Sequence, residues 1–411
     1  MMLAAGVGML GVACGGAMEG DEVDAMLDTE SSAIVNGSVL SAAQVQDSGL
    51  VAIYHPKLPS FTWYPRPCSG VVIRSYAPPF STVGVVTWVL TARHCVTTDG
   101  GIWGPLASPN QLRLIPSTNP GPAAPNPPAA AVTPVSVTDL GGLAGDTAIV
   151  TLLVDWSAIA SRRLGLFVGK SSSLVGKSLT AFGYGINPND PSCSTNNTSV
   201  GAGIARSGGA FPVVSSSEYF GGQSASYSYT NSNSAGQSVV CGDSGGPDQL
   251  LTLNGMRYVL GIHSGPDGGT MRSDVINKAL LDTIGGLFLS PSNNRSFDLA
   301  VDANNNIIFV ANGDLRRAWT KYDAATRQLV MSGSCVGTVT NAAGQLVPKV
   351  MPCNSADPWQ KWDFNASFQL KSVQNGQCWT SPSAGQLTLS ACTSGWFGPS
   401  ASQQWLFSAQ P

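Results

Sequence analysis

Charged side chains are scarce in this chain of 411 residues, where 24 acidic and 21 basic side chains leave a net charge of −3. That balance gives no reason to expect a nucleic acid as a partner. Histidine is rarer still, with only His55, His94 and His263, and no cluster of histidine and cysteine has metal-ligand spacing outside the motifs described below. We therefore expect no metal and no cofactor. Low charge, 47 glycines and few helical patterns favour an exported, β-rich protein in an oxidising space.

The amino-terminal apolar run is too short for a membrane span. It covers residues 1–13, whereas a span needs about 20 apolar residues, and its length suits a signal segment. Leu10 to Cys14 resembles a bacterial lipobox with the leucine one place too far upstream. Lipidation of Cys14, giving an outer-surface lipoprotein, and simple removal of residues 1–14, giving a secreted protein, both stay open. Residues 15–33 carry acidic but no basic side chains, which predicts an acidic propeptide.

The segment Cys241-Gly-Asp-Ser-Gly-Gly-Pro247 places one serine, Ser244, on a turn rich in glycine. A serine hydroxyl is a poor nucleophile unless a base takes its proton. Because glycine has no Cβ, the backbone N–H groups of Gly242 and Ser244 could approach a developing oxyanion. The motif therefore predicts a histidine and a buried acid elsewhere in the chain.

His94 and Asp146 meet that demand. His94 lies in Thr-Ala-Arg-His-Cys and Asp146 in Asp-Thr-Ala-Ile, and the order His94, Asp146, Ser244 has gaps of 52 (146 − 94) and 98 (244 − 146) residues. Singly these segments could be a core histidine, a strand cap and a glycine-rich turn. Together they resemble the chymotrypsin-like serine proteases. The resemblance implies that His94 is the base, Asp146 orients it, and Ser244 is the nucleophile with an oxyanion hole at Gly242 and Ser244.

Three departures from that family pattern stand out. Arg93 puts a cation beside the base, Cys241 lies one residue closer to the serine than usual, and Ser264 is not followed by tryptophan. The last departure bears on specificity, because the resemblance implies that Ser264 and Gly265 pair with the substrate backbone.

Primary specificity is expected to depend on Ser238 and His263. The resemblance places Ser238 at the base of the primary pocket, where its neutrality disfavours Arg or Lys substrates. Gly-Ile-His263 resembles the glutamyl endopeptidase branch, in which that histidine meets an acidic side chain of the substrate. The alternative is a strand histidine satisfied by a neighbouring hydroxyl. We expect cleavage after Glu or a neutral residue.

The segment Ser32-Ala-Ile-Val-Asn-Gly37 resembles the activation junction of the same family. It implies cleavage after Ala33, so that the new amine of Ile34 pairs with Asp243, whose lone buried charge would otherwise be costly. An ordinary start of a β-strand is the alternative interpretation of Ile34 and Val35.

After residue 295 the chain repeats itself. Trp319, Trp362 and Trp405 follow one another at intervals of 43 residues, and Gln360 and Gln403 complete two Gln-x-Trp motifs. Equal periods predict three copies of one β unit that bury their tryptophans together. Residues 296–411 resemble a ricin B-type β-trefoil, although Arg317 stands where the first copy should have glutamine.

These resemblances imply disulfides and a possible sugar site. Cys68 and Cys95 match the pair around the protease histidine, Cys193 and Cys241 remain for the second barrel, and Cys335–Cys353 and Cys378–Cys392 would lie within trefoil copies. Such trefoils often bind sugar through an aspartate after the first cysteine of a copy, which is absent from both cysteine-bearing copies; Asp298 and Asp302 are the candidates in the first copy. Carbohydrate or cell-wall glycan is therefore a candidate partner, on fold analogy alone.

The expected fold is all-β. Residues 34–289 form a double six-stranded β-barrel protease that ends in a helix over Asp274 to Leu287, residues 290–295 form a linker, and residues 296–411 form the trefoil. We expect an exported, monomeric serine endopeptidase that acts on proteins or peptides. The competing hypothesis is a glycan-binding adhesion protein whose protease part is weak or regulatory.

Overall fold

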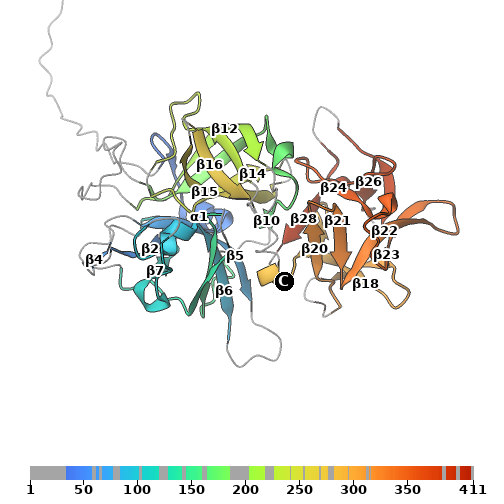
Figure 1. The fold of residues 1–411 in the computed structure, drawn as a ribbon, viewed down its shortest axis with the longest axis horizontal. Helices are drawn as coiled ribbons and strands as arrows, with labels where there is room; N and C mark the ends of the chain where they lie inside the picture. The colour runs from blue at the N-terminus through green and yellow to red at the C-terminus, as the bar shows by residue number, and fades with distance from the viewer. Residues whose placement is uncertain are drawn as a thin grey trace, which may run out of the picture. The chain divides into compact units, whose positions relative to one another are not determined.

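The computed structural model describes residues 34–57, 62–63, 67–76, 84–100, 104–119, 128–140, 145–159, 164–185, 203–217, 226–240, 242–252, 255–267, 270–275, 282–294, 296–311, 314, 316–381, 386–394 and 399–408. They belong to one compact unit, Ser31–Pro411. The expected all-β fold is confirmed, since β-strands dominate the described residues and the helix α1 spans only Ala42–Ser48 (Figure 1). The predictions for Cys14, for the propeptide and for Cys193 and Cys241 concern residues outside the described part of the chain.

The first sheet contains six antiparallel strands in the order β7-β2-β5-β6-β9-β8. Their bounds are Leu50–Tyr54 (β2), Cys68–Tyr76 (β5), Val86–Thr91 (β6), Arg113–Ile115 (β7), Ser136–Asp139 (β8) and Ala148–Leu152 (β9). Leu114 of β7 and Val132, which precedes β8, exchange backbone hydrogen bonds of 2.9 and 2.7 Å. That exchange brings the two edges of the sheet together as a barrel. A side hairpin comprises Pro56–Lys57 (β3) and Thr62–Trp63 (β4).

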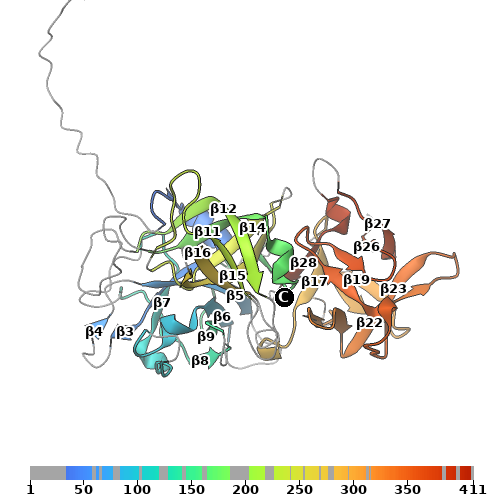
Figure 2. The same cartoon turned by 45° about the horizontal axis from the view of Figure 1, so that its top comes forward.

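The second sheet closes on itself. Strands β12, β11, β14, β15, β16 and β13 pair in that order, and β13 pairs again with β12, so six strands form a ring; β1 and β10 attach to it. Figure 2 shows its strands in green and yellow. The bounds are Ser38–Val39 (β1), Leu164–Leu166 (β10), Ser178–Gly183 (β11), Arg206–Ser217 (β12), Ser226–Thr230 (β13), Pro247–Leu251 (β14), Arg257–Asp267 (β15) and Thr270–Val275 (β16).

Twelve further strands, β17 to β28, repeat one pattern three times. Hairpins β18–β19, β22–β23 and β26–β27 alternate with the pairs β20–β21, β24–β25 and β28–β17. Backbone hydrogen bonds of 2.8 Å join these pairs at Thr320 to Leu287, Trp362 to Arg327, and Trp405 to Phe368. This threefold ring fits a β-trefoil. Membership of the ricin B-type family stays a prediction.

The bounds of these strands follow. They are Phe288–Pro291 (β17), Phe297–Val301 (β18), Ile307–Ala311 (β19), Thr320–Asp323 (β20), Gln328–Met331 (β21), Ser334–Thr340 (β22), Leu346–Met351 (β23), Trp362–Phe364 (β24), Leu370–Ser372 (β25), Gln377–Thr380 (β26), Thr388–Ala391 (β27) and Trp405–Ser408 (β28).

The expectation that three repeated tryptophans are buried together is wrong for Trp319. Trp362 and Trp405 are fully buried at the starts of β24 and β28, but the matching strand β20 starts at Thr320, and Trp319 is 39% exposed. The ring between the two motif tryptophans belongs to Trp379, at 5.3 Å from Trp362 and 5.6 Å from Trp405. A shift of one residue along a strand reverses the face on which a side chain lies.

Two expected boundaries also move. Ser290 and Pro291, expected in a linker, belong to β17 and are buried, because the pairing of β17 with β28 completes the threefold ring. Asp274 and Val275, expected in the closing helix, belong to β16 and complete its pairing with Gly261 and Ile262. Residues 276–281 of that expected helix lie outside the described residues.

Candidate active site

The candidate catalytic side chains come from both barrels. His94 lies in the 3-10 helix η1 (Arg93–Val96), which follows β6, and Asp146 lies just before β9. Ser244 lies on the turn before β14, and Ser264 lies within β15. Each of them therefore stands at the end of a barrel strand or on one, where the pairing of neighbouring strands fixes its position.

Asp146 holds His94 in two ways. Its Oδ2 lies 2.7 Å from His94 Nδ1, and its Oδ1 accepts the backbone N–H of His94 at 2.9 Å. Ser264 donates its hydroxyl to the same Oδ2 at 2.8 Å. With Nδ1 donating to the carboxylate, Nε2 of His94 is left as the basic nitrogen.

The carboxylate stays ionised although it is only 2% exposed. Burial by itself raises the pKa of Asp146, but the hydrogen bonds and charge of His94 together with the hydroxyl of Ser264 outweigh burial and hold that pKa below its ordinary value. Arg93, expected to act on the base, instead pairs with Asp139 at 2.8 Å.

The Ser244 turn lies against the segment that carries His94. The carbonyl oxygen of Ser244 accepts the N–H of Ser69 at 2.8 Å and lies 3.4 Å from Cys95 Sγ. The disulfide between Cys95 and Cys68, the residue before Ser69, links these two contacts, and it is the pairing that the family resemblance implied. The turn that carries Ser244 and the segment that carries His94 are thus held against each other by contacts between the two barrels.

Two glycines of the turn are required by its geometry. Gly242 has a φ of 95° and Gly245 a φ of 80°. A Cβ at Gly245 would stand 2.2 Å from the Ser69 oxygen, and one at Gly242 would stand 2.9 Å from Gly185 Cα. Within the described part of the chain, the N–H groups of Gly242 and Ser244 donate to no protein acceptor. Both groups are therefore available to an oxyanion.

Asp243, next to the serine, is fully buried and accepts three backbone N–H groups. The donors are Ile34 at 3.3 Å, Val240 at 2.9 Å and Gly185 at 2.8 Å. Burial raises the pKa of Asp243 to about 6. The side chain of Ile34 is itself fully buried. The Asp243 carboxylate thus lies beside the nitrogen that cleavage after Ala33 would convert to an amine.

The residues expected to contact the substrate differ in their surroundings. Ser238 exchanges backbone hydrogen bonds with Val35, at 2.8 and 3.2 Å. The pairing of β15 with β14 ends at Ile262, so β14 does not cover the edge of β15 at Ser264 and Gly265. Within the described residues no other strand pairs with that edge, which could therefore accept an added strand.

The expectation that His263 meets a substrate side chain is not supported, because its ring is fully buried. Its Nδ1 lies 3.0 Å from the backbone carbonyl oxygen of Asp243, and its Nε2 lies 2.6 Å from Asp248 Oδ1. Successive side chains of a strand point to opposite faces, and since Ser264 reaches Asp146, His263 points inward. The alternative interpretation, a strand histidine whose ring is hydrogen-bonded within the protein, is closer to the structure. Asp248 was not anticipated, because nothing in its local sequence marks it.

Among the described residues, the group Cys68, His94 and Cys95 has atoms close enough to share a metal ion. Its two sulfurs form a disulfide, so neither is a thiolate ligand. In the same part of the chain, no helix is long and apolar enough to cross a membrane.

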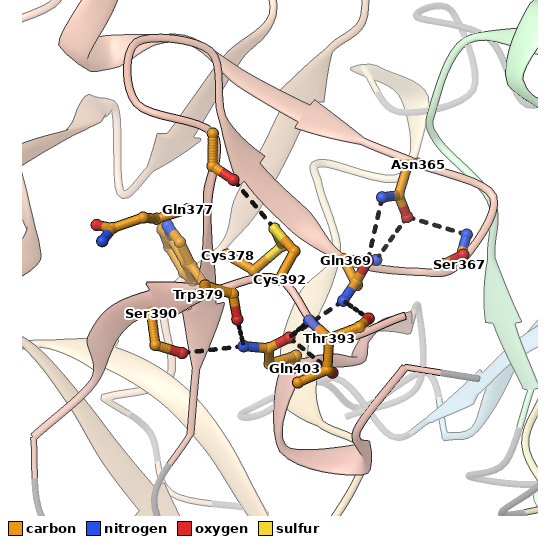
Figure 3. Close-up of a disulfide and its surroundings, with 12 residues drawn as sticks. Asn365, Ser367, Gln369, Gln377, Cys378, Trp379, Ser390, Cys392, Thr393 and Gln403 are labelled. Atoms are coloured by element: carbon orange, nitrogen blue, oxygen red, sulfur yellow. Dashed lines mark hydrogen bonds between the residues drawn. A yellow bond between two sulfur atoms is a disulfide. The ribbon is translucent and has the colours of Figure 1, made fainter. Parts of the chain in front are cut away.

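In the trefoil the motif glutamines are structural. Gln403 is buried, and it accepts the N–H of Thr393 at 2.8 Å (Figure 3). It also donates to the Ala391 carbonyl oxygen at 2.8 Å. These two residues flank Cys392, whose disulfide with Cys378 is present as expected, as is Cys335–Cys353. Gln360 makes the same pair of bonds around Cys353, to Asn354 at 2.8 Å and Pro352 at 3.1 Å.

Both candidate sugar-binding carboxylates have structural partners. Asp298 is buried and accepts the hydroxyl of Ser290. Asp302 accepts the backbone N–H groups of Asn304 and Asn306, each at 2.8 Å, and so caps the turn between β18 and β19. Neither contact points to a ligand.

Comparison with known proteins adds little to this geometry. No protein-family model and no curated protein matches the chain. Among solved structures, HL collagenase is 18% identical with a TM-score of 0.39, covering 61% of this chain and 96% of its own. The active form of Rv3671c protease from M. tuberculosis is 17% identical with a TM-score of 0.34, covering 59% and 81%. Likenesses this weak carry no argument, so the proposal below rests on the residues of the site.

Proposed function

We propose that this chain is a serine endopeptidase that cleaves peptide bonds in protein substrates through an acyl-enzyme on Ser244. The observation that carries the proposal is that Asp146 hydrogen-bonds His94 twice, at 2.7 Å to the ring and 2.9 Å to the backbone. Ser264 donates a further hydrogen bond to the same carboxylate. A buried carboxylate that fixes a histidine tautomer beside a serine on a glycine turn is the arrangement that activates a hydroxyl.

In the proposed reaction, Ser244 Oγ bonds to the carbonyl carbon of the substrate while its proton passes to His94 Nε2. The N–H groups of Gly242 and Ser244 stabilise the negative oxygen of the tetrahedral intermediate. The C–N bond then breaks, and the proton on His94 goes to the leaving amine. Water attacks the acyl-enzyme, gives a proton to His94, and the ester bond breaks as Ser244 regains its proton and the acid product leaves.

Substrate recognition is proposed to combine the open edge of β15 with a neutral primary pocket. A substrate segment would add to β15 at Ser264 and Gly265. Because Ser238 carries no charge, we expect cleavage after a neutral residue in preference to Arg or Lys. Recognition of Glu by direct contact with His263 is not proposed, since both ring nitrogens of that residue already have partners.

We further propose that the chain is exported as a zymogen and activated between Ala33 and Ile34. Support comes from the buried Ile34 and from its N–H, which already points at Asp243 Oδ2. Cleavage would replace this neutral donor by an ammonium group. Three disulfides among the described residues favour an oxidising compartment.

The decisive test is mass spectrometry of the secreted protein after treatment with a fluorophosphonate, with Ser244→Ala as the control. We expect an adduct on Ser244 in a chain that begins at Ile34, and none in the variant. A correctly processed chain without adduct would contradict the proposal and favour the glycan-binding alternative. That alternative has its own measurement, since binding of the full Ser244→Ala chain to a glycan array needs no activated serine.

A further inference from the structure

His263 is joined to the Ser244 turn by three hydrogen bonds, two from its backbone and one from its ring. The backbone N–H of His263 donates to the Gly246 oxygen at 3.0 Å, and its carbonyl accepts the N–H of Gly245 at 2.8 Å. The third bond joins ring Nδ1 to the backbone carbonyl oxygen of Asp243 at 3.0 Å. One residue of β15 thus contacts both sides of the nucleophile.

The partners of the ring determine its protonation. A carbonyl oxygen only accepts, so Nδ1 carries a hydrogen. Nε2 faces Asp248 Oδ1 at 2.6 Å, while Asp248 Oδ2 accepts the hydroxyl groups of Tyr227 and Ser273. Both oxygens of Asp248 accept hydrogen bonds in this arrangement, so Nε2 donates as well, and hydrogens on both nitrogens make the ring a cation.

The charge balance around the ring agrees. Burial lowers the pKa of His263, but the charge and hydrogen bond of Asp248, with a smaller contribution from Asp243, more than compensate and raise it above its ordinary value. Among the described residues, Tyr229 of β13 lies beside the ring and Tyr227 of β13 bonds its partner Asp248. Burial raises the pKa of both tyrosines well above the ordinary value, so both stay neutral.

The bond to Asp243 has a consequence for Ser244. The carbonyl of Asp243 and the N–H of Ser244 belong to one peptide unit, which is planar and in its trans form points the two groups in opposite directions. That carbonyl is held twice, by His263 Nδ1 at 3.0 Å and by the N–H of Gly246 at 2.8 Å. The Ser244 N–H is therefore directed away from the buried ring, toward the outer side of the turn.

We infer that His263, anchored by Asp248, is a positioning residue that orients the Ser244 N–H as a donor of the oxyanion hole. This inference rests on the proposed function, because it assigns a role within that reaction. His263 does not touch the substrate. It acts through one peptide unit, and Asp248 keeps the ring from turning away from the Asp243 oxygen.

A residue that merely fills the core behaves differently when it is replaced. Its loss lowers stability and the fraction of correctly folded enzyme, but leaves the turnover of each folded site unchanged. Loss of a positioning residue lowers kcat per active site, with KM little changed, because the oxyanion forms only in the transition state. Active-site titration separates the two.

The test compares His263→Leu, His263→Gln and Asp248→Asn with the processed wild-type chain. Val213→Ala is the matched control, because it removes buried methyl groups from β12 of the same barrel, which pairs with β1, β11 and β13 and not with the Ser244 turn. The substrate is a peptide amide selected from a library by wild-type cleavage, the active sites are titrated with fluorophosphonate, and the folded fraction is measured by thermal unfolding.

We expect His263→Leu to lower kcat per titrated site by about 10- to 100-fold, short of the 10²- to 10³-fold that removal of a whole oxyanion donor costs. KM should stay within about twofold. His263→Gln should recover part of the loss, because its amide can donate to the Asp243 oxygen. A peptide aldehyde, whose adduct carries an oxyanion, should bind His263→Leu more weakly by the same factor as the loss of kcat.

A kcat for His263→Leu within threefold of Val213→Ala would overturn the inference, as would a parallel rise in KM that accounts for the whole loss. If the leucine variant does not fold, His263→Gln and Asp248→Asn decide by the same criterion. A processed wild-type chain that neither reacts with fluorophosphonate nor cleaves any peptide would instead overturn the proposed function, and this inference with it.

Discussion

At the scale of single residues, Asp146 depends on donors from both barrels. His94 belongs to the first barrel and Ser264 to the second, and both donate to the same carboxylate. A buried carboxylate needs such donors, because an unpaired charge in the interior is costly. The arrangement of the candidate site therefore depends on the packing of the two barrels against each other.

Removal of the Ser264 hydroxyl should make this dependence measurable. Asp146 has a pKa below its ordinary value, so it adds stability that is present above the unfolded pKa near 3.8 and is lost as the pH falls through the folded pKa. We expect Ser264→Ala to lower the free energy of unfolding by about 1–3 kcal/mol at pH 7, and by less below pH 4. Ser215→Ala, at an exposed serine of β12, is the control for urea titrations at several pH values.

Asp243 should respond to pH with the opposite sign. In the intact chain its pKa is about 6, above the ordinary 3.8, so the contribution of Asp243 to stability is greatest at low pH and falls as the pH rises from about 4 through 6. The loss is on the order of 3 kcal/mol. In a chain that begins at Ile34 the new ammonium group should remove most of it. Unfolding of the intact chain, the processed chain and intact Asp243→Asn between pH 4 and 8 measures the effect, and equal slopes for all three would contradict it.

At the scale of elements, each cysteine-bearing trefoil copy is closed by a glutamine. Gln360 and Gln403 each bond the residues before and after the second cysteine of their copy. In the first copy, which has no such cysteine, Arg317 bonds the Asp314 oxygen at 3.0 Å and faces Asp298 at 3.5 Å. The motif thus ties a strand start to a hairpin end, which accounts for its recurrence without any ligand.

We expect Gln403→Leu to destabilise the protein by about 1–3 kcal/mol, because it leaves the Thr393 N–H and the Ala391 oxygen without their buried partner. The Cys378–Cys392 disulfide should also become easier to reduce, since the chain on both sides of Cys392 is released. Thermal unfolding and the rate of disulfide reduction measure the two effects. Gln345→Leu, at an exposed position between β22 and β23, should change neither, and equal effects of both variants would refute the proposed role of the motif glutamine.

At the scale of the whole molecule, the second barrel and the trefoil strands share one apolar core. The ring of Tyr258 from β15 stacks on Phe368 with centroids 3.5 Å apart, and its hydroxyl donates to the Trp405 oxygen at 2.7 Å. Phe167 adds a contact with Phe364 at 5.7 Å. Such contacts favour joint unfolding of the two parts.

Calorimetry tests this coupling. We expect one unfolding transition for the wild-type chain and two for Tyr258→Ala, which removes both the stack and the hydrogen bond between the parts. Tyr322→Ala is the matched control, because the hydroxyl of Tyr322 bonds the Trp362 oxygen at 3.0 Å within the trefoil. It should lower the stability and keep the number of transitions. Two transitions already in the wild-type chain would contradict the coupling.

The sequence by itself determined the all-β class, and its family resemblances predicted the candidate catalytic residues and the disulfides Cys68–Cys95, Cys335–Cys353 and Cys378–Cys392, which are present. The catalytic candidates could be named because a serine nucleophile needs particular residue types on a turn that only glycine can form, and the repeats because they share a period. Such signals are short and local.

Only the tertiary structure decided which side chains face inward. In the tertiary structure His263 faces Asp248, Trp379 and not Trp319 packs between the two motif tryptophans, and Ser290 belongs to a strand. These outcomes depend on register, and a shift of one residue reverses every side chain of a strand. Register is set by pairing with strands far away in the chain, which no local motif specifies.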